Sequence, residues 1–356
     1  MKKHILLCVI GMTPQIITET IYALAKKKIN IEELHVITTL DGKRKLTETL
    51  INKGILSQLI YEYNLPSIDF SEKSIYLIKN FKNKPLSDIR TPLDNESAGE
   101  IICKVVHKLT ARKNTILHCS LAGGRKTMGF YLGAALQMYG RKDDKLYHVL
   151  VNEEFENLPE FFYPPAKSKE IIIKTKDGQF LKKSTSEVKI ELAELPFLRL
   201  KELIDFSGKT FRELIDSTQI KFDNFKKIPY LGFIPAENIL KIGDRKIKLS
   251  YNLWEFYTKL ALQKKRACKH PQKLFCMNCT DCFLPMKGNT SLLTLFNQRE
   301  ENIRMKISKI NSIIKNSLIA YYGKDNINFF LINSVGSHGS KKYGIFLDKL
   351  KIVRED

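Results

Sequence analysis

The sequence predicts an α/β protein with a doubly wound parallel sheet, followed by a mostly helical C-terminal domain. Over roughly the first 165 residues, short apolar segments alternate with amphipathic segments of helical spacing. This alternation is typical of a parallel sheet with helices on its faces. From Phe197 onward, helical patterns dominate. We therefore expect two domains, 1–190 and 191–356, a division that suits a chain of 356 residues.

The first domain supplies the expected elements in order. An apolar strand at 4–10 ends at Gly11, and Thr13 is the expected N-cap of a helix whose first residue is Pro14. Further strands are expected at 34–39, 74–78, 116–119 and 146–151, with helices at 43–63, 98–109 and 127–140. The segment 171–184 has the pattern of a hairpin with an Asp-Gly turn.

The stretch ILHCSLAGGRKTM, residues 116–128, runs from a strand through a glycine turn into a helix. Glycines let the backbone approach a ligand closely, and the first N–H groups of a helix attract anions. Arg125 and Lys126 add positive charge at that point. The segment therefore predicts a phosphate or nucleotide site, although a tight turn with two solvated cations is the alternative, because the pattern is not a complete P-loop.

Ligands of parallel sheets bind beyond the carboxyl ends of the strands. The segments 11–15 and 120–127 are expected to lie side by side there. The candidate ligand-binding residues are Gly11, Met12, Gln15, Ser120, Ala122, Gly123, Gly124, Arg125 and Thr127. Asp88, Arg90 and Asn95 follow a predicted strand and either approach the same pocket or form a polar loop with a helix cap at Asn95.

The charge balance points to a polyanionic partner. The chain has 59 Lys and Arg residues against 38 Asp and Glu, a net charge of +21. Such an excess favours nucleotide or nucleic acid as a partner, or else reflects a generally basic surface. No apolar run approaches the length of a membrane span, and seven cysteines, an odd number, argue against a disulfide framework. We expect a cytoplasmic protein.

Three segments carry a resemblance to a known family: ILLCVIGMTPQIITETIYAL, SLAGGRKTMGFYLGAALQMYGRKDDKLYHVLVNEEFE and FFYPP. Together they resemble the CRISPR-associated ring nucleases, which carry a Rossmann-like CARF domain that senses cyclic oligoadenylates. The resemblance covers residues 1 to about 195 and is looser beyond. It implies a homodimer that binds cyclic tetra-adenylate across its two-fold axis.

The resemblance also implies a reaction. A ribose 2′-OH attacks the adjacent phosphate without a metal, leaving a 2′,3′-cyclic phosphate and a 5′-OH. By similarity the catalytic residues are Lys126, which stabilises developing charge, and Thr13, which positions the reacting groups. Threonine stands here where related enzymes more often have serine. The alternative is a sensor without activity that binds nucleic acid when the ligand is bound.

The C-terminal half resembles winged-helix regulators, with a predicted order of strand, helix, helix and β-hairpin. Residues 241–320 contain 16 basic and 5 acidic residues. The predicted recognition helix and wing carry Lys306, Lys309, Lys315, Lys341 and Lys342. This domain is expected either to bind DNA or RNA or only to stabilise the dimer.

A cysteine-rich insert at 266–285 interrupts this domain. Its spacing is C-x7-C-x2-C-x2-C, formed by Cys268, Cys276, Cys279 and Cys282. Clustered cysteines in a reducing compartment predict a metal. A structural Zn²⁺ ion is expected, with a [4Fe–4S] cluster or free thiols as alternatives and His270 as a possible replacement ligand. No cofactor is expected for catalysis.

Two further patterns are expected to be structural. His118 lies in a predicted central strand and is expected to be a core residue. Arg141 and His148 imitate the spacing of HEPN ribonucleases, but they connect a helix to a strand within the first domain. We therefore expect no HEPN effector domain.

Overall fold

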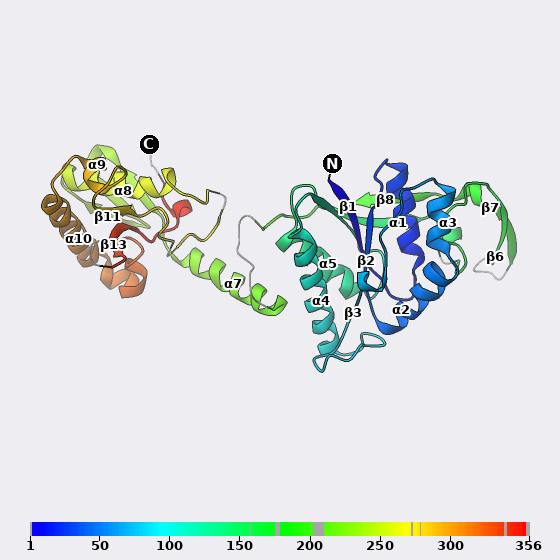
Figure 1. Cartoon of the computed structure of the whole chain (residues 1–356). Coiled ribbons are helices and arrows are strands. Elements are labelled where there is room, and N and C mark those ends of the chain that lie inside the picture. Colours follow the sequence, from blue (N-terminus) through cyan, green and yellow to red (C-terminus); the bar gives the residue numbers. More distant parts are fainter. Residues whose placement is uncertain are drawn as a thin grey trace. The chain divides into compact units, whose positions relative to one another are not determined.

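The computed structural model describes residues 2–156, 158–174, 179–201, 210–271, 273–277, 279–337 and 340–353. The chain forms two compact units: the first contains residues 1–201 and the second contains residues 212–356 (Figure 1). The predicted boundary at 190 coincides with the start of β8 (Ile190–Glu194), which pairs with β5 (Lys145–Val151). The structural division therefore lies further along the chain than the sequence predicted.

The first unit is a mixed α/β structure around a mostly parallel six-stranded sheet, as predicted. The spatial order of its strands is β3 (Ile75–Leu77), β2 (Glu33–Thr38), β1 (Lys3–Val9), β4 (Thr115–Ser120), β5 and β8. All neighbouring pairs are parallel except β5 and β8. The helices α1 (Gln15–Lys26) and α3 (Ile55–Glu62) lie on one face, and α4 (Pro92–Thr110) and α5 (Lys126–Tyr139) on the other (Figure 1).

Burial explains why β1 and β4 form the centre of the sheet. The side chains of Ile5 to Ile10 are fully buried, as are Leu117 and Cys119. Such continuous apolar strands require covering on both faces, which the two helix pairs provide. The carboxyl ends of β1 and β4 consequently open at the same edge, with their following loops side by side.

Two predicted helices differ from the structure. The segment predicted as one helix at 43–63 contains α2 (Leu40–Leu46), a π-helical turn at Thr47–Asn52 and α3. The break occurs at Gly54, whose φ of 69° is left-handed. The predicted cap at Asn95 is wrong, because α4 begins earlier, with Thr91 as the N-cap of a capping box that Asp94 completes.

The remaining elements of the first unit are the short helix α6 (Glu153–Glu156) and a hairpin of β6 (Glu170–Lys174) and β7 (Phe180–Ser184). The hairpin confirms the prediction for 171–184. The predicted Asp-Gly turn lies at 175–178, outside the described residues.

The second unit contains two three-stranded sheets and several helices. One sheet has the order β11-β10-β9 and the other β12-β14-β13. The bounds are α7 (Phe211–Lys227), β9 (Leu231–Ile234), β10 (Ile239–Ile242), β11 (Arg245–Lys248), α8 (Tyr251–Arg266), β12 (Leu284–Pro285), α9 (Leu292–Phe296), α10 (Glu300–Ile327), β13 (Ile332–Val335) and β14 (Lys342–Ile345). The helices α9 and α10 are separate because Asn297, with a φ of 49°, ends α9.

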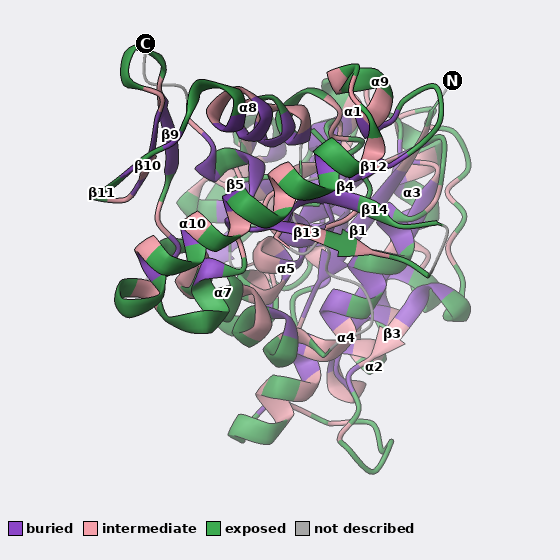
Figure 2. Ribbon diagram, turned by 90° about the vertical axis from the view of Figure 1, so that its left-hand side faces the viewer, coloured by how far each residue is buried: buried purple, intermediate pink, exposed green. Residues whose placement is uncertain are grey.

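The second unit has its own hydrophobic core. Leu253, Phe256, Tyr257 and Leu260 from α8 pack with Ile303, Ile310, Ile314 and Leu318 from α10. The buried stripe of α8 is visible as its purple face in Figure 2. Within the described part of the chain, no helix combines the length and apolar character that crossing a lipid bilayer requires.

Candidate functional site

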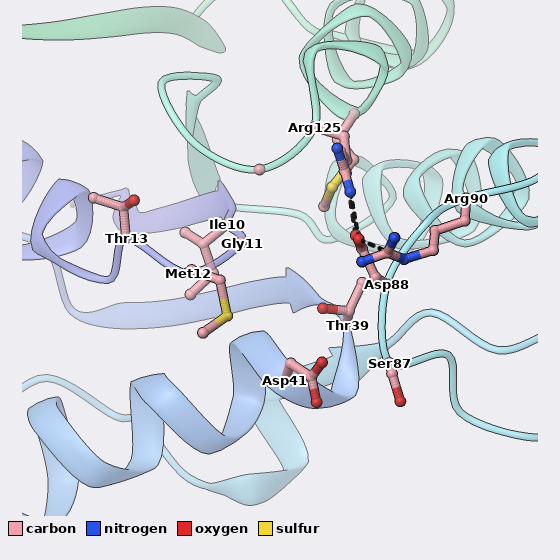
Figure 3. A pocket seen from close by; sticks show the side chains of 12 residues that line it. Ile10, Gly11, Met12, Thr13, Thr39, Asp41, Ser87, Asp88, Arg90 and Arg125 are labelled. Atoms are coloured by element: carbon pink, nitrogen blue, oxygen red, sulfur yellow. Dashed lines mark hydrogen bonds and ion pairs between the residues drawn. The ribbon is translucent and has the colours of Figure 1, made fainter.

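A pocket of about 380 Å³ opens beyond the carboxyl end of β1 in the first unit (Figure 3). Three segments form its walls: the loop after β1, the start of α2, and the chain before α4, with the glycine turn closing it. Its lining residues are Ile10, Gly11, Met12, Thr13, Thr39, Asp41, Ser87, Asp88, Arg90, Gly124, Arg125 and Met128. The two loops that the sequence placed together thus share one pocket.

Glycines bring these loops into backbone contact. A Cβ atom on Gly11 would lie 3.3 Å from the Cα atom of Gly124, and one on Gly123 would lie 2.9 Å from the carbonyl oxygen of Val9. Gly124 also has a φ of +75°, which favours glycine. Larger residues at these positions would push the loops apart, so the pocket depends on the absence of side chains there.

Both loops lead into helices that direct free N–H groups toward the pocket end of the sheet. α1 begins at Gln15 with Pro14 at its N-cap, and no side chain caps it. The predicted cap by Thr13 is wrong, because the helix begins one residue later than expected. The Thr13 hydroxyl therefore remains available at the pocket wall, where the structure records no hydrogen bond from it to a described residue.

The helix α5 begins at Lys126, with Arg125 as its N-cap and no side-chain cap. Lys126 and Thr127 are exposed, and the structure records no ion pair between Lys126 and a described residue. Lys126 is not among the residues that line the pocket. It directly follows the lining residue Arg125 in the chain, and its side chain is exposed to solvent.

An ion-pair cluster crosses the pocket from the glycine turn to the chain before α4. The Arg125 guanidinium donates to both carboxylate oxygens of Asp88, with its Nε atom 3.1 Å from Oδ1. The Nε atom of Arg90 lies 3.3 Å from Oδ2 of the same carboxylate. Hydrogen bonding from Arg125 lowers the pKa of Asp88 below its usual value. Asp88 thus neutralises charge that could otherwise attract an anion (Figure 3).

The other predicted ligand-binding residues lie behind the lining. Gln15 donates from Nε2 to the carbonyl oxygen of Pro159 at 3.0 Å, and Ala122 packs against the apolar core. Ser120 is fully buried, and its hydroxyl lies 3.2 Å from that of Thr20. Ser120 is therefore not among the residues that line this pocket.

Sequence reasoning missed five lining residues: the apolar Ile10 and Met128 and the polar Thr39, Asp41 and Ser87. Thr39 and Asp41 directly follow β2, the strand next to β1, so the rule that ligands bind beyond strand ends could have found them. Ser87 follows no recognisable pattern, because its position depends on the backbone bond from Leu40 N–H to the carbonyl oxygen of Leu86, 2.8 Å long.

The residues expected to be structural have structural contacts. His118 is buried, its Nε2 atom lies 2.8 Å from Nδ1 of His4, and burial lowers its pKa to about 4. Arg141 binds Asp144 and the carbonyl oxygen of Arg112. These contacts hold Arg141 in the connection between α5 and β5.

The four cysteines of the insert lie in the second unit, between α8 and β12. Cys276 is buried, and its Sγ atom accepts a hydrogen bond from the backbone N–H of Lys349 at 3.3 Å. Burial raises the pKa of Cys282, and the neighbouring thiols of Cys279 and Cys268 raise it further. Among the described residues no group of three or more His, Cys, Asp or Glu side chains is arranged at metal-binding distance.

The predicted nucleic-acid contacts lie on two elements of the second unit. Lys309 and Lys315 are exposed on α10, whereas Lys306 is half-buried with its Nζ atom 5.7 Å from the centre of the Phe256 ring. Lys341 and Lys342 are exposed at the start of β14. The tip of this hairpin includes residues 338 and 339, which lie outside the described residues.

A comparison with protein families gives a match over most of the first unit. Residues 13–221 match the family described as CRISPR-associated protein NE0113. The chain belongs to this family. The match spans more than half of the chain, beginning at Thr13, and it includes the glycine turn and α5 but ends before the cysteine insert. A comparison with curated proteins gave no match.

Proposed function

We propose that this CRISPR-associated protein binds cyclic tetra-adenylate in the first-unit pocket and cleaves it without a metal. The observation that supports this most is the backbone contact between Gly11 and Gly124, which brings two loops and two uncapped helix N-termini to one pocket. Free N–H groups and helix dipoles at such a position favour phosphate groups. The resemblance of the first unit to a Rossmann-like CARF domain supports the same ligand.

The volume of the pocket favours a shared ligand. About 380 Å³ lies at the small end of ligand sites and is less than a ring of four nucleotides occupies. Two copies of the chain related by a two-fold axis would present the same pocket twice. A ring with its own symmetry would then occupy both pockets, and for that reason a homodimer is part of this proposal.

The proposed reaction requires positioning and charge stabilisation. A ribose 2′-oxygen loses its proton and attacks the adjacent phosphorus. The bond from phosphorus to the 5′-oxygen breaks, and that oxygen gains a proton. The products are a 2′,3′-cyclic phosphate and a 5′-OH. The exposed Thr13 hydroxyl would hold the attacking group, and the Lys126 ammonium would stabilise the charge that develops on the phosphate.

The test is incubation of the purified protein with radiolabelled cyclic tetra-adenylate in EDTA. We expect linear products ending in a 2′,3′-cyclic phosphate. Lys126→Ala should lower the single-turnover rate about 10²–10³-fold, because one charge-stabilising donor is lost. Lys104→Ala, an exposed lysine in α4, is the matched control and should retain the wild-type rate. Tight binding without turnover by the wild type would leave only a sensor.

A second candidate function rests on the second unit, which we propose is a winged helix that binds DNA or RNA. The order α8, β12, α9, α10, β13, β14 and the strand arrangement β12-β14-β13 support this architecture. In such folds the second helix of the pair enters a groove of the nucleic acid, which here is α10 with exposed Lys309 and Lys315. Replacing both by Gln should weaken DNA binding and reduce its salt dependence, whereas binding that stays unchanged would contradict this role.

A further inference from the structure

Two buried lysine side chains lie among the cysteines of the insert. Lys264, at the end of α8, is 3% exposed, and Lys349, after β14, is 6% exposed. Burying an ammonium group costs several kcal/mol unless an opposite charge compensates it. Among the described residues neither lysine forms an ion pair with a carboxylate. Additional negative charge in the insert would therefore stabilise both ammonium groups beyond what the single buried carboxylate of Asp348 supplies.

The contacts of Lys264 point toward the insert. Its Nζ atom donates to the carbonyl oxygen of Ile345 at 2.9 Å and to that of Cys276 at 3.4 Å. Carbonyl oxygens satisfy two of its three N–H groups but carry no net charge. They orient the ammonium beside Cys276 and leave its charge uncompensated.

Lys349 contacts the same cysteine loop from the other side. Its Nζ atom lies 3.4 Å from the Sγ atom of Cys268 and also donates to the carbonyl oxygen of His270. Its backbone N–H donates to the Sγ atom of Cys276 at 3.3 Å. One residue thus donates hydrogen bonds to two of the four sulfurs, which is an arrangement suited to sulfur that carries negative charge.

The same cluster contains one buried carboxylate and one further buried lysine. The buried carboxylate of Asp348 accepts from the backbone N–H groups of Cys276 and Leu350. Lys351, also buried, lies over the rings of Phe225 and Tyr230, with its Nζ atom 4.4 and 4.1 Å from their centres. Lys351 therefore has its own compensation in these aromatic faces. Lys264 and Lys349 have no comparable contact recorded among the described residues.

We propose that Cys268, Cys276, Cys279 and Cys282 form a tetrathiolate metal centre whose negative charge is balanced by Lys264 and Lys349. Four thiolates around Zn²⁺ carry a net charge of −2, as do four thiolates around a [4Fe–4S]²⁺ cluster. Two ammonium groups neutralise either centre. The cysteine spacing and the buried lysines are independent observations, and each supplies what the other lacks.

The centre joins segments far apart in the sequence. Through Lys264 it is tied to the end of α8, and through Lys349 to the chain after β14. Both elements contribute to the core of the second unit. Metal binding would therefore contribute directly to the free energy of folding of this unit. The role is structural, and it is separate from cyclic oligoadenylate cleavage.

The experiment measures metal and thiols in the full-length protein purified without oxygen. We expect one zinc ion or one four-iron cluster per chain by elemental analysis. Four thiols should be protected from a disulfide reagent until a strong chelator is added. Zinc together with a colourless protein identifies the ion, whereas iron with visible absorption identifies the cluster.

The variants test the lysines themselves. Lys264→Met and Lys349→Met should weaken metal affinity about 10–100-fold in competition with a chelator, the loss typical of residues that support metal ligands. Lys265→Met, at the exposed neighbouring position of α8, should match the wild type. Unchanged affinity in both buried variants, or a wild-type protein without metal and with four reactive thiols, would overturn the proposal. The wild-type measurement remains decisive if a variant does not fold.

Discussion

The pocket of the first unit and the cysteine loop are built on opposite principles. The position of the pocket depends on backbone: glycines at 11, 123 and 124 let two loops touch next to the starts of α1 and α5. The cysteine loop is formed by side chains, with thiols and two buried ammonium groups gathered on irregular backbone. The contact between the two loops of the pocket should not tolerate a larger side chain at the glycine positions. The cysteine loop should instead be sensitive to the loss of individual thiol or ammonium groups.

The sharpest test of this contrast adds volume to the glycine turn. Gly123→Val should abolish ligand binding and destabilise the first unit by several kcal/mol, because its Cβ atom would lie 2.9 Å from a backbone oxygen. Gly133→Ala in α5 is the matched control, since its Cβ atom would meet only Leu146 at 3.8 Å. Thermal unfolding and a binding titration measure both. Wild-type binding by Gly123→Val would show that the loops do not need to touch.

A second test concerns a buried ionisable group of the first unit, the carboxyl group of Glu19. Burial, with the nearby Glu156 carboxylate, raises the pKa of Glu19 in α1 from 4.5 to about 7. A carboxyl group with a raised pKa contributes stability that is present below pH 4.5 and is lost as the pH rises through 7.

Glu19→Gln should therefore stabilise the protein at pH 8, on the order of 1–3 kcal/mol, and have little effect near pH 4.5. Unfolding by denaturant at the two pH values measures the difference. Glu48→Gln, at a solvated position in the π-helical turn, is the control and should show no such pH dependence. Equal effects of Glu19→Gln at both pH values would mean that this carboxyl group is not perturbed.

The smallest expected effect concerns the ion pair across the pocket. Asp88→Asn should release Arg125 for an incoming phosphate and strengthen the binding of cyclic tetra-adenylate by up to about 5-fold at low salt, since exposed ion pairs are worth about 0.2–1 kcal/mol. Asp143→Asn, which removes an ion pair with Lys2 elsewhere on this unit, should leave the affinity unchanged. Weaker binding by Asp88→Asn would instead indicate that Asp88 contacts the ligand or fixes the loop before α4.

The comparison also shows what sequence can predict. Alternating apolar patterns were enough to place the parallel sheet and to bring the loops of Gly11 and Gly124 together, because strand ends in such a sheet open at one edge. The burial of Ser120 was not predictable, since the side chain of a strand residue next to a glycine turn can face either the pocket or the core. Its contact with Thr20 comes from a helix 100 residues away.

The contacts around the cysteine loop of the second unit were harder to predict from the sequence, for a related reason. Cysteine spacing predicted a metal, but nothing in the local sequence linked Lys264 or Lys349 to the insert. Their burial depends on contacts with Cys276 and Ile345, which only the folded chain brings together. Long-range hydrogen bonds of this kind leave no periodic signal, whereas β-strand and helix patterns do.

The most direct test of the central proposal is to find where the ligand binds. Photo-crosslinking with 8-azido cyclic tetra-adenylate, followed by mass spectrometry of peptides, maps the contact. We expect attachment within 10–13, 87–90 or 124–128, suppressed by an excess of unlabelled ring. Attachment only in the second unit, or labelling that the unlabelled ring does not suppress, would contradict the assignment of this pocket as the cyclic oligoadenylate site.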